Sequence, residues 1–157
     1  MIAETISNVV TSILDRPYVT LHIAGLVVAV GAVVVTDVLT LVAKLRPRAI
    51  KLVVLCSPLF SMLVWAGFLV LAVSGMLLVE QTRSYVTSTV FQQKMIFVGI
   101  VFVNGLLLNE RIVPRFEEFV TRGVYDPPRK FKLIAAISAV ISMLGWWGTT
   151  FVAYFGL

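Results

Sequence analysis

The chain has 157 residues, of which 59% are hydrophobic, and its formal net charge is +5. This length and composition exclude a separate soluble enzyme domain and predict one compact all-α membrane domain, residues 1–157. The basic excess does not indicate nucleic-acid binding, because ten of the thirteen Lys and Arg residues fall within two short segments, 44–51 and 111–132. In a four-helix arrangement both segments lie on one side of the membrane, against anionic lipid headgroups.

The first sixteen residues have apolar side chains at helical spacing, with polar residues between them. They include no basic start and no long apolar core, so we do not expect a cleaved signal peptide. The pattern predicts a short helix over about 2–15 that lies in the membrane interface and ends before Pro17.

Four apolar stretches follow, and their lengths match the thickness of a bilayer. The runs are Tyr18–Thr36, Leu52–Val79, Met95–Asn109 and Leu133–Leu157. A hydrocarbon core of about 30 Å needs roughly 20 helical residues, and the third run reaches that length once Val90–Lys94 is included. Since hydrocarbon offers no hydrogen bonds, each run must be a helix. We predict an integral four-helix bundle with helices over about 18–43, 50–79, 90–112 and 131–156.

The distribution of basic residues predicts the orientation of these helices. Only Arg16, Arg83 and Lys94 fall on the side opposite the two basic segments. By the positive-inside rule, the basic side is cytoplasmic and both termini lie outside the cytoplasm of a multi-pass inner-membrane protein.

Two of the predicted helices carry small residues along one face. In the first helix this face contains His22, Gly25, Ala29, Ala32, Thr36 and Thr40, and in the fourth it contains Ala135, Ser138, Ser142, Gly145 and Thr149. Small residues let helices approach closely in a membrane, so these two helices are the best candidates for tight contacts. Asp37 lies about 22 Å further along the first helix than His22, near its cytoplasmic end.

The third helix is the least apolar of the four. It begins at the polar Gln92–Lys94 and ends at Asn109–Arg111. The next segment, Pro114–Arg122, mixes aromatic and acidic residues and precedes Gly123, so we predict a short surface helix on the cytoplasmic side.

Lys94 and His22 occupy matching depths, because each lies about four residues into a helix that runs inward. They define a predicted outer polar layer. Asp37 and Asn109 define an inner layer, to which Asn104 and Glu110 are further candidates. One sequence does not determine whether the first and third helices are adjacent.

Each of these polar side chains has both a structural and a functional interpretation. His22, the only histidine, either locks helices together by a hydrogen bond or acts as a haem ligand, metal ligand or proton carrier. Lys94 either extends to the headgroups or takes part in a site. Asp37 is either neutralised, by a basic neighbour or by a proton, or is functional. Trp65, Trp146 and Trp147 are expected to pack in the core, or to stack on a tetrapyrrole.

Three short motifs carry a family resemblance. Leu21–Gly25 lies in the first helix, Ser57-Pro58 comes early in the second, and Gln93-Lys94-Met95 opens the third. Together they resemble the HemJ-type protoporphyrinogen oxidases and related four-helix membrane proteins such as the CopD-like copper-resistance domains. The resemblance implies that His22 binds haem b and that Lys94 is functional. Asn109-Glu110 departs from the family pattern, in which an Asn-Glu-x-Pro motif stands just before the last helix.

The first functional hypothesis is therefore a haem- or porphyrin-binding redox protein, an oxidoreductase in the membrane. His22 Nε2 would ligate iron, Lys94 would pair with a propionate or donate protons, and Asp37 would be a second catalytic group. A lysine and a histidine in one dry site should not both be charged, so we expect neutral His22 beside positive Lys94. The sixth iron ligand would be Met62, Met76, Met95 or Met143, a group from a second subunit, or none.

The second hypothesis is a homo-oligomeric proton or metal transporter that uses both polar layers. A third is a structural subunit whose polar residues only fix helix pairing. Thiol chemistry, dihistidine metal binding, phosphate-loop chemistry and Ser-His-Asp catalysis are excluded, because the required motifs are missing from the sequence.

Overall fold

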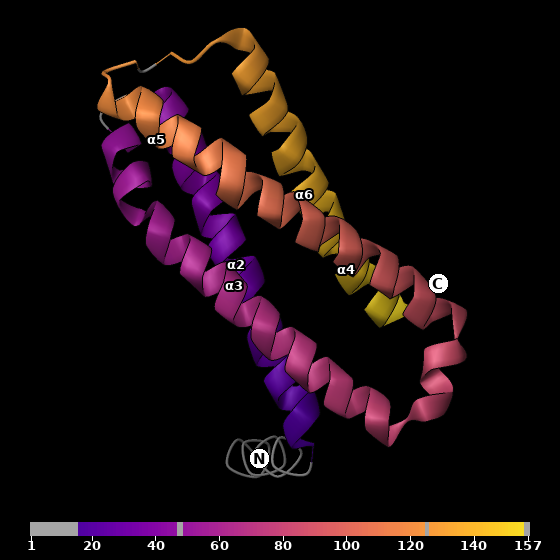
Figure 1. Ribbon diagram of the computed structural model, residues 1–157. Coiled ribbons are helices and arrows are strands. Elements are labelled where there is room, and N and C mark those ends of the chain that lie inside the picture. The colour runs from indigo at the N-terminus through magenta and orange to yellow at the C-terminus, as the bar shows by residue number, and fades with distance from the viewer. Residues whose placement is uncertain (1–15, 47–48, 125, 156–157) are drawn as a thin grey trace, which may run out of the picture.

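A computed structural model describes residues 16–46, 49–124 and 126–155, and these form helices joined by short connections. Helix α2 (Pro17–Leu45) runs antiparallel to α3 (Ile50–Gln81), and a short 3-10 helix, η2 (Arg83–Thr87), leads to α4 (Thr89–Leu107). A π-helical segment, η3 (Leu108–Ile112), connects α4 to α5 (Val113–Thr121), and α6 (Arg129–Phe155) completes the chain (Figure 1). The predicted interfacial helix lies outside the described residues.

Four helical spans are long and apolar enough to cross a membrane, as predicted: Pro17–Ala43, Ile50–Gln81, Thr89–Thr121 and Arg129–Val152. Their bounds lie close to the predicted ones, except that the third span is longer. Large apolar side chains are exposed along all four spans, where they face the region that lipid would occupy. Trp147 is among them at 59% exposure, so the prediction that it packs in the core was wrong.

The short helix predicted from Pro114 is present as α5, but it is not separate from the third span, which corrects that part of the prediction. It continues α4 in one helical span that reaches Thr121. Proline lacks the N–H that an α-helix would use and crowds the preceding turn, and the π-helical segment η3 directly before it takes up this irregularity. The helix therefore carries on past the predicted membrane boundary.

The α2–α3 contact depends on small residues at its closest point. A Cβ atom added to Gly67 would lie 2.8 Å from the Gly25 carbonyl oxygen and 2.8 Å from the Ala29 backbone N. The predicted small-residue face of α2 is confirmed, since Gly25, Ala29 and Ala32 are buried, although Thr40 at its end is exposed. Its partner is the neighbouring helix α3, whose position the sequence had not indicated.

The corresponding face of α6 packs against α4. Two side chains of α4 pack directly over glycines of α6. A Cβ on Gly145 would lie 2.5 Å from the Val101 side chain, and a Cβ on Gly148 would lie 2.6 Å from the Phe97 side chain. Asn104 and Ser138 join the same pair of helices: the Ser138 hydroxyl donates to Asn104 Oδ1 at 2.7 Å, and Asn104 Nδ2 donates to the Ser138 carbonyl at 2.9 Å. The predicted face of α6 is thus confirmed.

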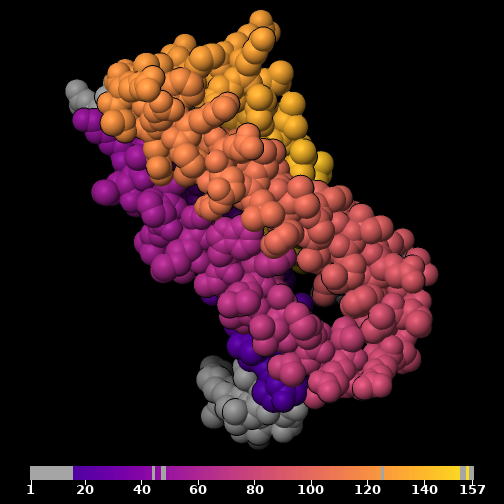
Figure 2. Space-filling model, in the orientation of Figure 1, coloured from indigo at the N-terminus to yellow at the C-terminus, as the bar shows by residue number. Residues whose placement is uncertain are grey.

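The two helix pairs meet through an apolar cluster of Ala29, Val101 and Trp146. A second cluster at the α5 end joins Ala43, Ile50 and Val53 to Phe116 and Val120 of α5. Figure 2 shows a hollow between the end of α3 and the beginning of α4, at the opposite end of the molecule from α5. The second cluster thus holds α5 against the adjoining ends of α2 and α3.

Candidate functional site

The outer polar layer brings together three helices at His22. Lys94 Nζ of α4 lies 3.5 Å from His22 Nε2, and Ser74 Oγ of α3 lies 3.0 Å from His22 Nδ1. The predicted proximity of His22 and Lys94 is therefore confirmed, and it is the long Lys94 side chain that connects α4 to α2 here. The roles of both residues as ligand or catalytic group stay predictions.

The hydrogen bonds of Ser74 determine which nitrogen of the imidazole carries the proton. The Ser74 hydroxyl has one hydrogen, which it donates to the Val70 carbonyl, its closest partner. Ser74 Oγ can then only accept from His22 Nδ1–H. Independently, a lysine ammonium has donors and no acceptor, so its contact with Nε2 requires a lone pair on that nitrogen. The first argument places a proton on Nδ1 and the second leaves a lone pair on Nε2, so together they assign neutral His22 with Nδ1 protonated and Nε2 unprotonated.

Local structure in α3 and α4 positions Ser74 and Lys94 beside His22. Ser88 caps the start of α4, where its hydroxyl oxygen accepts from the Phe91 backbone N at 3.2 Å, and Lys94 follows within the next turn. Ser74 is fully buried, and a Cβ on the adjacent Gly75 would lie 3.4 Å from His22 Cε1. The imidazole is thus fixed by α3 on one edge, and its Nε2 is directed to the flexible Lys94 side chain.

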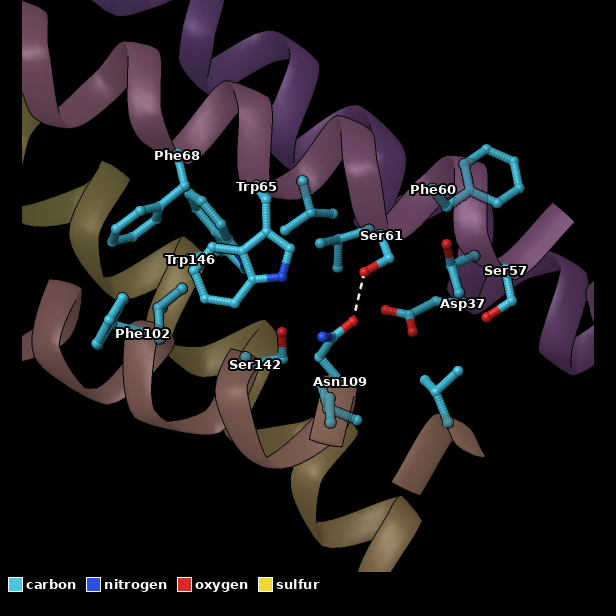
Figure 3. A pocket seen from close by; sticks show the side chains of 17 residues that line it. Asp37, Ser57, Phe60, Ser61, Trp65, Phe68, Phe102, Asn109, Ser142 and Trp146 are labelled. Carbon is cyan, nitrogen blue, oxygen red and sulfur yellow. Dashed lines mark hydrogen bonds between the residues drawn. The ribbon is translucent and has the colours of Figure 1, made fainter. Parts of the chain in front are cut away.

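The inner polar layer lines a cavity of about 140 Å³ between all four helices. Asp37 and Asn109 both line this cavity, as do Ser57, Ser61 and Ser142 (Figure 3). The Ser61 hydroxyl donates to Asn109 Oδ1 at 2.6 Å, and Asn109 Nδ2 lies 3.5 Å from Glu110 Oε1. The grouping of Asp37 with Asn109 is therefore confirmed, whereas Glu110 is exposed and does not line the cavity.

Asn104 does not belong to this layer, which corrects the prediction that it was a candidate. It is buried against Ser138 of α6, so its amide serves helix pairing. Asn109 and Glu110 both lie in the π-helical segment η3. A π turn adds a residue to the helical repeat and so changes the direction in which the following side chains project, which is common at functional sites.

Ser61 and Ser74 of α3 were not predicted from the sequence. Ser74 lies two turns after Gly67, so the two share a face, and the small size of both residues was the available signal. Ser61 had no comparable signal, because its role depends on Asn109, 48 residues away.

The methionines proposed as iron ligands face outward. Met62, Met76, Met95 and Met143 are 47–69% exposed. Within the described residues, no three His, Cys, Asp or Glu side chains come close enough to hold a metal ion together. His22 is thus the sole imidazole available to an iron atom from one copy of the chain.

Comparison with known proteins gives no match: no protein-family model fits the chain, and no curated protein or solved structure is significantly similar to it.

Proposed function

We propose that the protein is a haem- or porphyrin-binding redox protein of the membrane, of the type that its three short motifs resemble. His22 would be the iron ligand, and Lys94 would pair with a carboxylate of the macrocycle and supply protons. The observation that carries this proposal is the Nδ1–H···Ser74 hydrogen bond, which leaves the Nε2 lone pair for a ligand.

The residues around His22 fit this role in their chemistry. Metal-ligating histidines usually donate their second ring N–H to a neighbouring oxygen, which fixes the ring, and Ser74 provides that oxygen. Lys94 Nζ now occupies the direction in which Nε2 would bind iron, but four methylenes let the ammonium turn aside. Its charge would then remain near the macrocycle's carboxylates. When bound, haem supplies one-electron chemistry.

A second copy of the chain is the proposed source of any further iron ligand. The four methionines are exposed on the outside of the bundle, where a second copy could contact them.

The test is an absorption spectrum and metal analysis of protein purified in mild detergent with haem supplied during expression. We expect a Soret band that is lost in His22→Ala and weakened or shifted in Lys94→Met. Lys132→Met is a matched control, because Lys132 pairs with the exposed Asp126 and not with His22. Absence of a Soret band and of bound iron in the wild-type protein would refute the proposal.

Proton transfer across the membrane is a second candidate, which a different observation favours. Lys94 contacts His22 in the outer layer, and a separate cavity holds Asp37 in the inner layer, so titratable groups occur in both halves of the bundle. In this scheme Asp37 accepts protons and a homo-oligomer completes the path. Proton flux into liposomes that is unchanged in Asp37→Asn would eliminate it.

A further inference from the structure

The inner cavity has one polar end and one aromatic end. Asp37, Ser61 and Asn109 stand at the polar end, and the Asp37 carboxylate points toward the Ser61–Asn109 pair (Figure 3). Trp65, Phe68, Phe102 and Trp146 line the other end. The cavity therefore has the two-sided character of a binding site for a small amphipathic molecule.

The aromatic end is built from rings that support one another. Trp65 meets Phe102 edge-to-face with centroids 5.8 Å apart, and it meets Phe68 in the same way at 6.1 Å. Phe68 and Phe102 are 5.6 Å apart. Such a cluster offers an apolar surface and negative ring faces, which attract the body and the charge of an organic cation.

The polar end carries the Asp37 carboxyl group, which is exposed and has no basic partner among the described residues. No hydrogen bond or ion pair reaches the Asp37 carboxylate from any residue that the structure describes. A carboxylate beside a largely apolar cavity is costly unless a positive group accompanies it. The cavity therefore favours a cationic guest over a neutral or anionic one.

The size of the cavity fits a small guest, and its lining disfavours bare metal ions. About 140 Å³ is close to the roughly 150 Å³ of an engineered apolar cavity that binds benzene. A hard metal cation needs about six oxygen ligands, whereas most of this lining is hydrocarbon and Asn109 Oδ1 already accepts from Ser61. A molecule with one ring and one ammonium group would therefore fit the cavity, with its ring at the aromatic end and its ammonium group at the polar end.

We propose that the cavity between Asp37 and the Trp65–Phe68–Phe102 cluster binds a small organic ammonium ion. The ammonium group pairs with Asp37, and the apolar body lies against the three rings. This site is separate from His22 and does not depend on the proposed function.

Benzylammonium is a suitable probe, with benzyl alcohol as its neutral counterpart. Binding to the full-length protein in detergent is followed by calorimetry and by the fluorescence of Trp65 and Trp146, both of which line the cavity. We expect saturable binding of benzylammonium that Asp37→Asn weakens by about tenfold to a hundredfold. The matched control Asp126→Asn removes an exposed acid whose partner is Lys132 and should leave binding unchanged.

A second pair of variants tests the cavity itself. A Cβ on Gly105 would lie 3.9 Å from Trp65 Cζ2, an ordinary contact, so Gly105→Ala should fold normally, narrow the cavity and weaken binding. Gly99→Ala on the same helix is the control, because its Cβ would meet nothing within 4 Å. Equal binding of benzyl alcohol, equal binding by Asp37→Asn, or no saturable binding would each overturn the proposal.

Discussion

The protonated nitrogen of His22 provides a direct test of the outer site. His22 is the only histidine, so ¹⁵N-histidine labelling gives signals from one imidazole without further assignment. In the wild-type protein at neutral pH we expect Nδ1 to carry the proton and Nε2 to lack one, because Ser74 accepts from Nδ1 and Lys94 donates to Nε2.

The perturbation is Ser74→Ala, which removes the oxygen that Nδ1–H contacts. Ser74 is 0% exposed, so water does not replace the lost acceptor directly. A net hydrogen bond contributes about 0.5–1.5 kcal/mol, which corresponds to a change of about twofold to twelvefold in the ratio of the two tautomers. The population should move toward Nε2–H, and Lys94 should then lose its acceptor.

The control is Ser138→Ala, which also removes a buried serine hydroxyl but one that pairs with Asn104 on the other side of the bundle. It should leave both His22 signals in place. A wild-type spectrum with Nε2 protonated would refute the assignment of the hydrogen bonds. An unchanged tautomer ratio in Ser74→Ala would show that Ser74 does not determine it.

Three further predictions concern packing and topology. Gly67→Ala should lower the free energy of unfolding in detergent by about 1–3 kcal/mol, because its Cβ would meet the α2 backbone at 2.8 Å, whereas Gly31→Ala, which meets nothing, should not destabilise. Asn104→Ala and Ser138→Ala should each cost about 1 kcal/mol, and a double-mutant cycle should show coupling between them. A reporter fused to the C-terminus should be active only outside the cytoplasm; cytoplasmic activity would contradict the predicted orientation.

Properties that depend on local patterns were predictable. An apolar run of bilayer length must form a helix wherever it lies, so the four spans followed from their lengths. A helix repeats every 3.6 residues, so the buried faces of α2 and α6 followed from the spacing of small residues. The matching depth of His22 and Lys94 also came from counting residues from the start of each helix, since depth depends only on rise, whereas their contact depends on how the helices pack.

The partners of these faces were not predictable, because they depend on rotation and crossing between helices. Ser74 reaches His22 only because Gly25 and Gly67 let α2 and α3 approach closely. Asn104 and Asn109 are five residues apart, yet one faces α6 and the other faces the inner cavity. No pattern within α4 distinguishes them, and the π-helical segment between α4 and α5 changes the direction of Asn109.

The sequence by itself thus determined that this is a membrane protein of four long helices with a lone histidine at the depth of a lysine. Only the tertiary structure decided that α2 pairs with α3, that Ser74 orients the imidazole, and that Asp37 borders an aromatic cavity. The physical reason is the separation along the chain of the residues that interact. In hydrocarbon, the backbone hydrogen bonds of a helix form within its own segment. A site, in contrast, consists of side chains up to 72 residues apart, and whether they meet depends on how whole helices pack.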